Sequence, residues 1–565
     1  MTDIAPITQR QRLGILVILG VVCAFGLFDH SLWSSNDTRE GAMIREMVRT
    51  GSWVTPLFNG KAYLEKPPLL HWTGAVLCKV FGTVNEGLVR LPAALYGFGT
   101  LLLVWVLARW LGCERGGITA AFLCATSLLF FEYSRIVLTD MALTFMVLAS
   151  LVLFWWAYAA PAPARWRYGV VILVSAVSFY AKGLLGPGFV WVSVCLFLVW
   201  QRRWALMLGL CLAFVPVFVL VLAPWVYALW KSGGQAFLYG VFWENQFGRF
   251  LSFNDPSLPL DPYYVHKEPF YFYFMHVPVR LLPWTLLVIA SLVYWFRRST
   301  VERGPLAGFL RITLVTMALV LHASSAKAAC YLLPLFPVLF LMTGVWLERA
   351  GLRGYARWEC GVIGLMVGAA GLMLVLAPIG YVVIQAMQVD VVCLDCPWTV
   401  AAGTGLSLLA LGLTVYVGIR VWRQWQAGDR VQAVLWAPML IAVLVIPTGA
   451  AFLPIVDRHR TYLPIVDPVR GEMARGRHMA LVGDRERDCG ALMFYLDSRI
   501  TVLPLTGSAV LTFLSTSCGS SGVVVDVGDL KRLEPFLNQI PCRVVAFNHS
   551  GHKASEFRMV LHDSP

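Results

Sequence analysis

The sequence predicts a polytopic α-helical membrane protein with interfacial helices in its first outer loop and a small soluble α/β domain at its C-terminal end. Of the 565 residues, 58% are hydrophobic and 14% are charged, and the mean hydropathy is +0.69. This composition is far too apolar for a soluble globular protein. Because a more polar composition begins after Phe452, we expect a membrane domain over residues 1–455 and a second domain over residues 456–565.

About thirteen apolar windows are long enough to be expected as transmembrane helices, which need roughly twenty residues each. They lie at 11–29, 87–110, 116–133, 136–158, 168–181, 184–200, 204–230, 273–296, 306–323, 328–347, 360–386, 398–419 and 432–452. The first window lacks a small-residue cleavage site after it, so we expect a retained helix and no cleaved signal peptide. The run 69–81 is apolar but short and contains His71 and Lys79, which favours a position on the membrane surface.

Basic residues indicate the orientation of these helices, because short cytoplasmic loops accumulate lysine and arginine. Alternate loops carry the arginines Arg10, Arg12, Arg109, Arg115, Arg165, Arg167, Arg202, Arg203, Arg297, Arg298, Arg303, Arg349, Arg353, Arg357, Arg420, Arg423 and Arg430. The N-terminus is therefore expected inside, and an odd number of helices places the C-terminus outside. Since the net charge of +13 is spread over these loops and forms no single stripe, membrane topology explains it better than nucleic-acid binding does.

The first outer loop, residues 30–86, is the charged segment expected to carry the chemistry. Over residues 38–48, apolar and charged side chains recur at a helical spacing, which predicts a short helix lying in the membrane interface. Further on, Glu65 and Lys66 precede a pair of prolines, which keep the backbone rigid and non-helical. The loop therefore presents a carboxylate and an ammonium beside the membrane.

Beyond residue 456, short β-like runs alternate with helix-like runs. The β-like runs are 479–482, 500–503, 523–527 and 544–547, and the helix-like runs are 469–474, 491–496 and 530–537. This alternation predicts a small soluble α/β domain on the outer face. Asp526 and Asp529 are better explained as strand-end and helix-capping residues than as a site.

Two aspartates on the outer side are candidate catalytic groups. Asp37 lies in the first outer loop, and Asp140 lies near the start of the expected helix 136–158. Each could simply cap a helix. A carboxylate near the bilayer, close to an arginine and a Glu-Lys pair, is also suited to general-base work at a water-poor interface. We therefore expect Asp37 to be the base and Asp140 to be a second acid or a group that orients the acceptor.

Basic side chains on the same outer side form a candidate phosphate site. The residues expected to bind phosphate are Lys66, Arg135, Lys182 and Lys327. Lysines at helix ends are ordinarily explained by snorkelling, but several of them together make the cationic pocket that a lipid phosphate requires. Further residues expected to contact the substrate are Arg39, Glu65, Glu244, Tyr271 and Tyr331.

A series of short motifs covers most of residues 30–340. They are Asn36-Asp37-Thr38-Arg39, Arg45-Glu46-Met47, Gly51-Ser52-Trp53, Asn59-Gly60, Glu65-Lys66-Pro67-Pro68, Ala181-Lys182-Gly183, Pro224-Trp225, Phe242-Trp243-Glu244, Arg249-Phe250, Pro269-Phe270-Tyr271, Ser324-Ser325-Ala326-Lys327 and Tyr331-Leu332-Leu333-Pro334. In these motifs and their order the chain resembles the GT-C class membrane glycosyltransferases. It is most similar to the family of the lipid A aminoarabinose transferase and the protein O-mannosyltransferase-like enzymes.

The resemblance implies an enzyme of the bacterial inner membrane whose active site faces the periplasm. Such an enzyme takes a sugar from a polyprenyl (undecaprenyl) phosphate carrier and attaches it, with inversion at the anomeric carbon, to an acceptor hydroxyl of lipid A, another glycan or a protein. The leaving phosphate monoester needs positive charge more than a proton, so no cofactor is required. The alternative is a divalent cation held by Glu65, His71 and Asp37, although only one histidine is available there.

The chain departs from the family pattern at two positions in the first outer loop. The family acid of an Asp-Glu-x-Arg motif falls on Asn36, and the acid beside it here is Asp37. We expect Asp37 to take the role, with Asp29 and Asp140 as alternatives. The tyrosine that follows the arginine in relatives is Glu40 in this chain, which alters the expected sugar or acceptor contacts.

Three other functions remain open from the sequence. A transporter or flippase of lipid-linked sugar would use the same outer cavity, but it predicts polar groups at mid-membrane and internal repeats, neither of which the sequence displays. A ligase with a diphosphate-linked donor would differ in donor and metal dependence. A catalytically inactive scaffold would present the outer α/β domain, and Asn36 is the residue that favours it.

Overall fold

The structure is a computed structural model, and most of its described residues are helical. It describes residues 7–161, 164–248, 268–297, 304–324, 326–353 and 356–366, scattered positions from 368 to 426, and then 456–457, 460–483, 485–516, 520–547 and 556–562. The windows expected as helices at 360–386, 398–419 and 432–452 fall largely outside the described residues.

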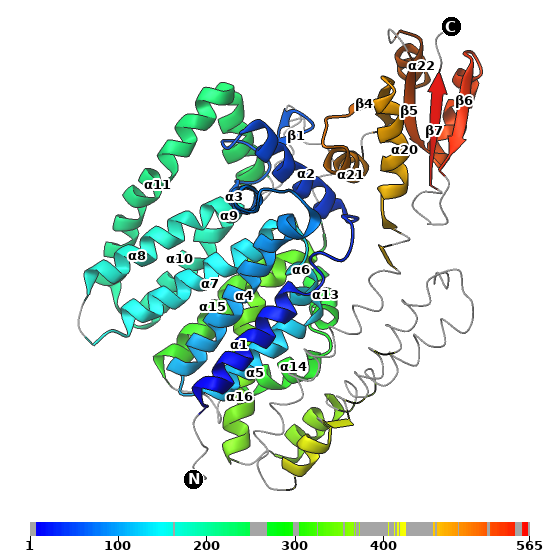
Figure 1. Cartoon of the computed structure of the whole chain (residues 1–565). Helices are drawn as coiled ribbons and strands as arrows, with labels where there is room; N and C mark the ends of the chain where they lie inside the picture. The colour runs from blue at the N-terminus through cyan, green and yellow to red at the C-terminus, as the bar shows by residue number, and fades with distance from the viewer. Residues whose placement is uncertain are drawn as a thin grey trace.

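Long helices packed side by side form the body of the molecule (Figure 1). Its elements are α1 (Gln9–Ala24), α4 (Glu86–Trp110), α5 (Glu114–Thr126), α6 (Leu128–Tyr133), α7 (Thr139–Tyr158), α8 (Arg165–Val177), α9 (Phe179–Lys182), α10 (Leu185–Trp200), α11 (Trp204–Leu238), the π-helix η1 (Tyr239–Gly248), α13 (Phe272–Arg280), α14 (Thr285–Phe296), α15 (Pro305–Ala323), the 3-10 helix η3 (Ala329–Leu335) and α16 (Phe336–Arg353). The closest pairings are α5 with α16, α4 with α5 and α7, and α7 with α8.

Each window expected before residue 353 contains a helix, but several of these helices are short or broken. Within the described residues, five helices are long and apolar enough to cross a membrane, or six if α13 and α14, which meet at a bend of 114°, count as one span. The short apolar run 69–81, expected on the membrane surface, is helix α3 (Leu69–Phe81). The fold is therefore that of a polytopic membrane protein, while the total of about thirteen spans stays a prediction.

The first outer loop folds over one end of the helical body. It contains α2 (Ser35–Thr50), a small hairpin of β1 (Leu57–Phe58) and β2 (Lys61–Ala62), and α3. The helix expected over 38–48 is thus present and is slightly longer. Ser34 caps it by accepting from the N–H of Asp37, and Gly51 ends it in the left-handed conformation with φ 71°, which glycine adopts without strain.

A mixed five-stranded sheet with helices follows near the C-terminal end. Its elements are α20 (Leu463–Ala474), β3 (His478–Val482), α21 (Glu486–Leu496), β4 (Thr501–Leu503), α22 (Gly507–Thr516), β5 (Ser521–Asp526), α23 (Val527–Leu537), β6 (Cys542–Ala546) and β7 (Phe557–His562). The strand order is β4-β3-β5-β7-β6. Strands β4, β3 and β5 are parallel, whereas β7 is antiparallel to both β5 and β6.

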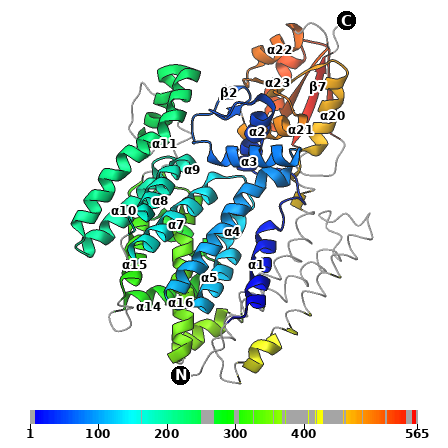
Figure 2. The ribbon, with the colours of Figure 1, turned by 60° about the vertical axis from the view of Figure 1, so that its left-hand side comes forward.

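This C-terminal α/β unit, residues 463–562, packs directly on α2, chiefly through α21 (Figure 2). One buried apolar cluster joins Ile44 and Met47 of α2 to Ile465 of α20 and Phe494 of α21. As a result most of α2 is buried. The helix expected to lie in the interface is instead enclosed by α3 on one side and by α21 on the other.

Gly490 sets how closely α21 approaches α2. A Cβ atom at this position would lie 2.8 Å from the carbonyl of Thr38 and 2.9 Å from the backbone nitrogen of Arg39. These are backbone atoms, so they cannot rotate away. We expect Gly490→Ala to lower the free energy of unfolding by about 1–3 kcal/mol through overpacking, measured by thermal unfolding of the purified protein.

Gly471 in α20 provides the matched control for that change. A Cβ atom there would meet nothing within 4 Å, and alanine favours a helix over glycine. We expect Gly471→Ala to leave stability unchanged or slightly raised. Equal destabilisation by both substitutions would show that the contact between α21 and α2 is not as close as described.

Candidate active site

The start of α2 anchors the first outer loop to the helical body through Asp37. Its Oδ2 accepts from Nη2 of Arg90 at 3.2 Å, and its Oδ1 accepts from the backbone N–H of Val137 at 2.7 Å. Both side chains are buried, with 2% of Asp37 and none of Arg90 exposed. The structure therefore engages both carboxylate oxygens of the residue expected to be the base, although each oxygen keeps a second lone pair.

Arg90 in α4 is a buried cation that was not among the site residues expected from the sequence. Besides Asp37, it donates to the carbonyls of Leu27, His30 and Ser31. It thereby fixes the segment between α1 and α2. The available signal was its position inside an apolar window, because an ionised residue in such a window is a candidate for a functional or anchoring role.

One turn further along α2, Glu40 lies at the centre of a buried cluster of charges. Its Oε1 accepts from Nη2 of Arg39 at 3.0 Å and from Nζ of Lys66 at 3.1 Å, while its Oε2 lies 2.8 Å from Nε2 of His71. Glu40 and His71 are completely buried. The residue that replaces the family tyrosine is thus the shared partner of three basic groups.

The charge of Glu40 follows from these neighbours. Burial alone would raise the pKa of Glu40, but Lys66, Arg39 and His71 outweigh it and hold that pKa well below its ordinary value. The carboxylate is therefore ionised at neutral pH. It offsets the charge of Lys66, whose side chain keeps 11% of its surface exposed.

The segment before Lys66 adds a second carboxylate and a phenol to the cluster. The hydroxyl of Tyr63 donates to Glu65, and Nζ of Lys66 lies 3.9 Å from Oε1 of Glu65. The guanidinium of Arg39 lies over the ring of Tyr63, 5.4 Å from its centroid. Burial, followed by the charge of Glu65, raises the pKa of Tyr63 well above its ordinary value, so the phenol stays protonated.

A second polar cluster joins Asp140 at the start of α7 to Lys182 at the end of α9. Nζ of Lys182 lies 2.5 Å from Oδ1 of Asp140 and 4.0 Å from the centroid of the Tyr331 ring. The fold therefore brings Asp140, Lys182 and Tyr331 together.

The remaining expected residues lie apart from these two clusters. Arg135 donates to backbone carbonyls, including that of Phe25 at 2.8 Å, and packs on the Phe131 ring, so it ties α1 to α6. Lys327 donates to the carbonyl of Ser324 at 2.6 Å. Tyr271 is exposed and packs on a neighbouring phenylalanine. Glu244 lies in η1, outside both clusters.

Glu65, His71 and Asp37 were the candidate ligands for a divalent cation. Within the part of the chain that the structure describes, no group of three or more His, Cys, Asp and Glu side chains could hold a metal ion. His71 instead bonds to Glu40, Glu65 to Tyr63, and Asp37 to Arg90. The three residues named as candidate ligands thus have other partners.

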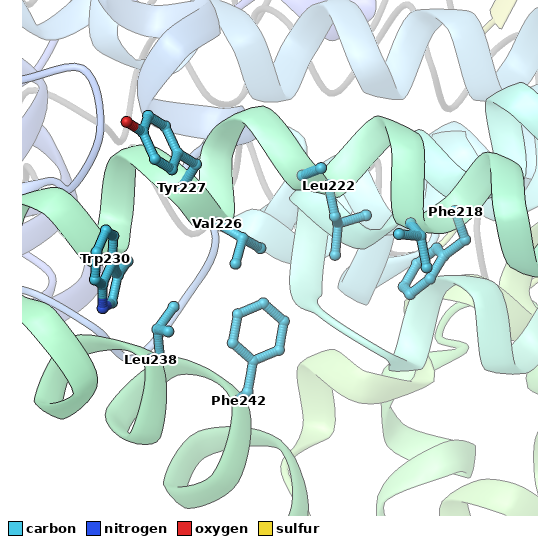
Figure 3. Close-up of a pocket in the computed structure, with 9 residues that line it drawn as sticks. Phe218, Leu222, Val226, Tyr227, Trp230, Leu238 and Phe242 are labelled. Carbon is cyan, nitrogen blue, oxygen red and sulfur yellow. The ribbon is translucent and has the colours of Figure 1, made fainter.

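An apolar groove lies between α11 and η1. It has a volume of about 550 Å³ and is lined by Phe218, Val219, Leu222, Ala223, Val226, Tyr227, Trp230, Leu238 and Phe242. Figure 3 shows Leu222 and Val226 of α11 pointing toward Leu238 and Phe242.

The groove is joined to the first outer loop by a shared apolar cluster. Leu64, two residues before Lys66, packs in the same cluster as Leu222 and Phe242. Asn245 of η1 also donates to the carbonyl of Leu64 at 3.3 Å. The groove is thereby placed beside the chain segment that carries Lys66.

Three comparisons with known proteins agree with this arrangement. The family model "Dolichyl-phosphate-mannose-protein mannosyltransferase" matches residues 41–232. An "Undecaprenyl phosphate-alpha-4-amino-4-deoxy-L-arabinose arabinosyl transferase" from Edwardsiella ictaluri is 30% identical over 408 residues, which are 70% of each chain. A protein of the same name from Pseudomonas aeruginosa is 28% identical over 490 residues, covering 84% of this chain and 81% of the relative.

A solved structure supports the fold over almost the whole length. The crystal structure of ArnT from Cupriavidus metallidurans bound to undecaprenyl phosphate matches with a TM-score of 0.74 and 18% identity, and covers 98% of both chains. The same protein in its apo state gives a TM-score of 0.72. At this level of identity the likeness establishes the fold.

The fold and the charged loop define a polytopic membrane glycosyltransferase of the GT-C class. Within that class, the chain belongs to the family of undecaprenyl phosphate-aminoarabinose arabinosyl transferases. The prediction of a membrane glycosyltransferase of this family is confirmed. None of the reported relatives supports the flippase alternative.

Proposed function

We propose that this chain transfers a sugar from undecaprenyl phosphate to an acceptor hydroxyl at the outer face of the bacterial inner membrane. The relatives are named for 4-amino-4-deoxy-L-arabinose, so we take that sugar as the donor group and lipid A as the first acceptor to test. A glycan or a protein is the alternative acceptor. No metal or other cofactor is part of the proposal.

The observation that carries this proposal is the position of Lys66 in a buried charged cluster, two residues after Leu64, which packs in the same apolar cluster as the groove. A polyprenyl phosphate has one anionic group attached to a long apolar chain. Lys66 and Lys182 supply positive charge, and the groove between α11 and η1 supplies an apolar surface beside the loop. Binding energy from the remote lipid tail would then help to position the sugar at the reacting atoms.

In the proposed reaction the acceptor oxygen attacks the anomeric carbon of the sugar. A carbon–oxygen bond to the acceptor forms as the bond from the anomeric carbon to the phosphate oxygen breaks, so undecaprenyl phosphate leaves with the bonding electrons and the configuration inverts. Asp37 accepts the hydroxyl proton, while Lys66 and Lys182 stabilise the charge that develops on the phosphate. Each carboxylate oxygen of Asp37 keeps one lone pair beyond its bond to Arg90 or Val137, and this lone pair can accept the proton.

Asp140 has a supporting role in this proposal. It lies 2.5 Å from Lys182 and so holds that ammonium beside Tyr331. Arg135 and Lys327 donate to backbone carbonyls, and we assign them to holding the helices in place. Arg39, Glu65 and Tyr331 line the two polar clusters and are the proposed contacts to sugar or acceptor.

We also propose the division of the chain. Residues 1–455 would form the membrane glycosyltransferase domain, with the catalytic loop at 30–86, and residues 456–565 would form a domain on the periplasmic side. The separate apolar core between β3, β5 and helices α22 and α23 supports this division. The contact of that unit with the first outer loop agrees with both lying on the same side of the membrane.

Mass spectrometry of envelope lipids tests the proposed function in cells. Cells with this chain are expected to contain a lipid A species heavier by one sugar, and cells without it are expected to lack that species. The undecaprenyl-linked sugar should accumulate in its absence. If every glycosylated product persists and the carrier-linked sugar merely changes sides of the membrane, transport replaces transfer as the function.

A further inference from the structure

Three ion pairs join the C-terminal α/β unit to helix α2. Glu486, in the first turn of α21, lies 2.7 Å from Nη1 of Arg39. Arg499 lies 2.8 Å from Oε1 of Glu46, and Asp497 lies 3.6 Å from Arg45. These pairs come from the same unit and reach the same helix, but only the first ends on a residue of the charged cluster around Glu40.

From Glu486, alternating charges continue without a break to Lys66. Glu486 binds Nη1 of Arg39 at 2.7 Å, Nη2 of Arg39 binds Glu40 at 3.0 Å, and Glu40 binds Lys66 at 3.1 Å. The exposed fractions of these side chains are 22%, 9%, 0% and 11% in the same order. Such a desolvated series is sensitive to the loss of any one member, because its partner is left as an uncompensated buried charge.

We propose that Glu486 is a positioning residue that holds Lys66 in place for the donor phosphate, acting through Arg39 and Glu40. The C-terminal unit thereby completes the active site without touching the substrate. This inference rests on the proposed function, because Lys66 is the group assigned there to the phosphate. It goes further by assigning a role in donor binding to a side chain outside the membrane domain.

The geometry at Glu40 explains how the effect is transmitted. Oε1 of Glu40 is shared between Nη2 of Arg39 and Nζ of Lys66, while Nη1 of the same guanidinium is occupied by Glu486. Without the Glu486 carboxylate, Arg39 can turn both nitrogens toward Glu40 in a bidentate pair, which is the stronger geometry. The second nitrogen would bond Oε2, which His71 also contacts, so the Glu40 carboxylate would rotate and shift Oε1, the atom that positions Lys66.

The test compares Glu486→Gln with Arg499→Gln in the purified full-length protein. Arg499→Gln removes the ion pair with Glu46 at the same interface. Lys66 pairs with Glu40 and Glu65, so this change does not touch the series of charges that ends on Lys66. We expect Glu486→Gln to raise KM for undecaprenyl phosphate-linked aminoarabinose by roughly 3–30-fold with a smaller change in kcat. Arg499→Gln should leave KM within about twofold of the wild type, and Glu486→Asp should restore part of the loss.

Binding of undecaprenyl phosphate alone gives a second readout that needs no turnover. Its affinity should fall in Glu486→Gln and not in Arg499→Gln. Equal effects of the two variants would show that Glu486 only docks the C-terminal unit, and an unchanged KM and affinity would remove the role altogether. If the wild type transfers no sugar, the proposed function fails, and the binding comparison still decides whether Glu486 acts on the phosphate site.

Discussion

Asp37→Asn is expected to lower the rate of sugar transfer by about 10²–10⁴-fold, the usual contribution of a positioned general base. The amide has nearly the same shape as the carboxylate but cannot accept the proton of the acceptor hydroxyl. Turnover of purified protein with the undecaprenyl-linked sugar measures the effect. Donor KM should change little, because the side chain is not assigned to the phosphate.

The structure allows loss of the base to be separated from loss of the fold. Arg90, which faces Asp37, keeps three backbone carbonyl acceptors in the variant, so we expect the protein to remain folded and inserted. Thermal unfolding checks this directly. Asp29→Asn is the matched control, since Asp29 pairs with His30 at 2.8 Å and is 36% exposed; if it loses activity while Asp37→Asn retains it, the base is Asp29.

Lys66→Ala is expected to reduce turnover by about 10²–10³-fold, comparable to removing one donor that stabilises a developing oxyanion. It should also weaken binding of undecaprenyl phosphate, because the ammonium is assigned to both the bound and the leaving phosphate. Kinetics and a direct binding measurement on the same preparation give the two quantities. Glu40 keeps Arg39 and His71 as partners, which favours survival of the fold.

Lys61 provides a control of equal charge in the same loop. It lies exposed in β2, a few residues before Lys66, so Lys61→Ala removes the same net charge from the outer surface. We expect this variant to bind and turn over the donor normally. An unchanged donor affinity in Lys66→Ala would refute the phosphate role and leave Lys182 as the candidate cation.

The order of the helices and the elements of the charged first outer loop were predictable from sequence, because they depend on local patterns. Apolar windows of about twenty residues mark helices whatever surrounds them. The helix over 38–48 was predicted from its helical periodicity. The Glu65-Lys66 segment was predicted to be non-helical because two prolines follow it. Strands β3, β4, β5 and β6 lie close to the β-like runs expected for them.

The features that were missed depend on contacts distant in sequence. Burial of α2 comes from α21, more than four hundred residues later along the chain. The partners of Asp37, Arg90 in α4 and the backbone of Val137, follow from packing that no local pattern indicates. The sequence identified Glu40 only as a departure from the family, whereas its position between Arg39, Lys66 and His71 requires three segments to meet.

Two elements of the C-terminal unit were also overlooked. The helix α22 (Gly507–Thr516) is short and rich in serine and threonine, which are weak helix formers. The strand β7 (Phe557–His562) lies near the chain end and pairs antiparallel between β5 and β6. Its place in the sheet is set by those partners, so the expected alternation of strands and helices gave no signal for it.

Reconstitution of the purified chain in lipid vesicles tests the central claim most directly. The vesicles would contain undecaprenyl phosphate-linked aminoarabinose and lipid A, and mass spectrometry would follow both lipids over time. We expect lipid A to gain one sugar for each undecaprenyl phosphate released, and this exchange to stop in Asp37→Asn and Lys66→Ala. Movement of the intact donor across the bilayer with no glycosylated product would contradict a transferase and establish a transporter.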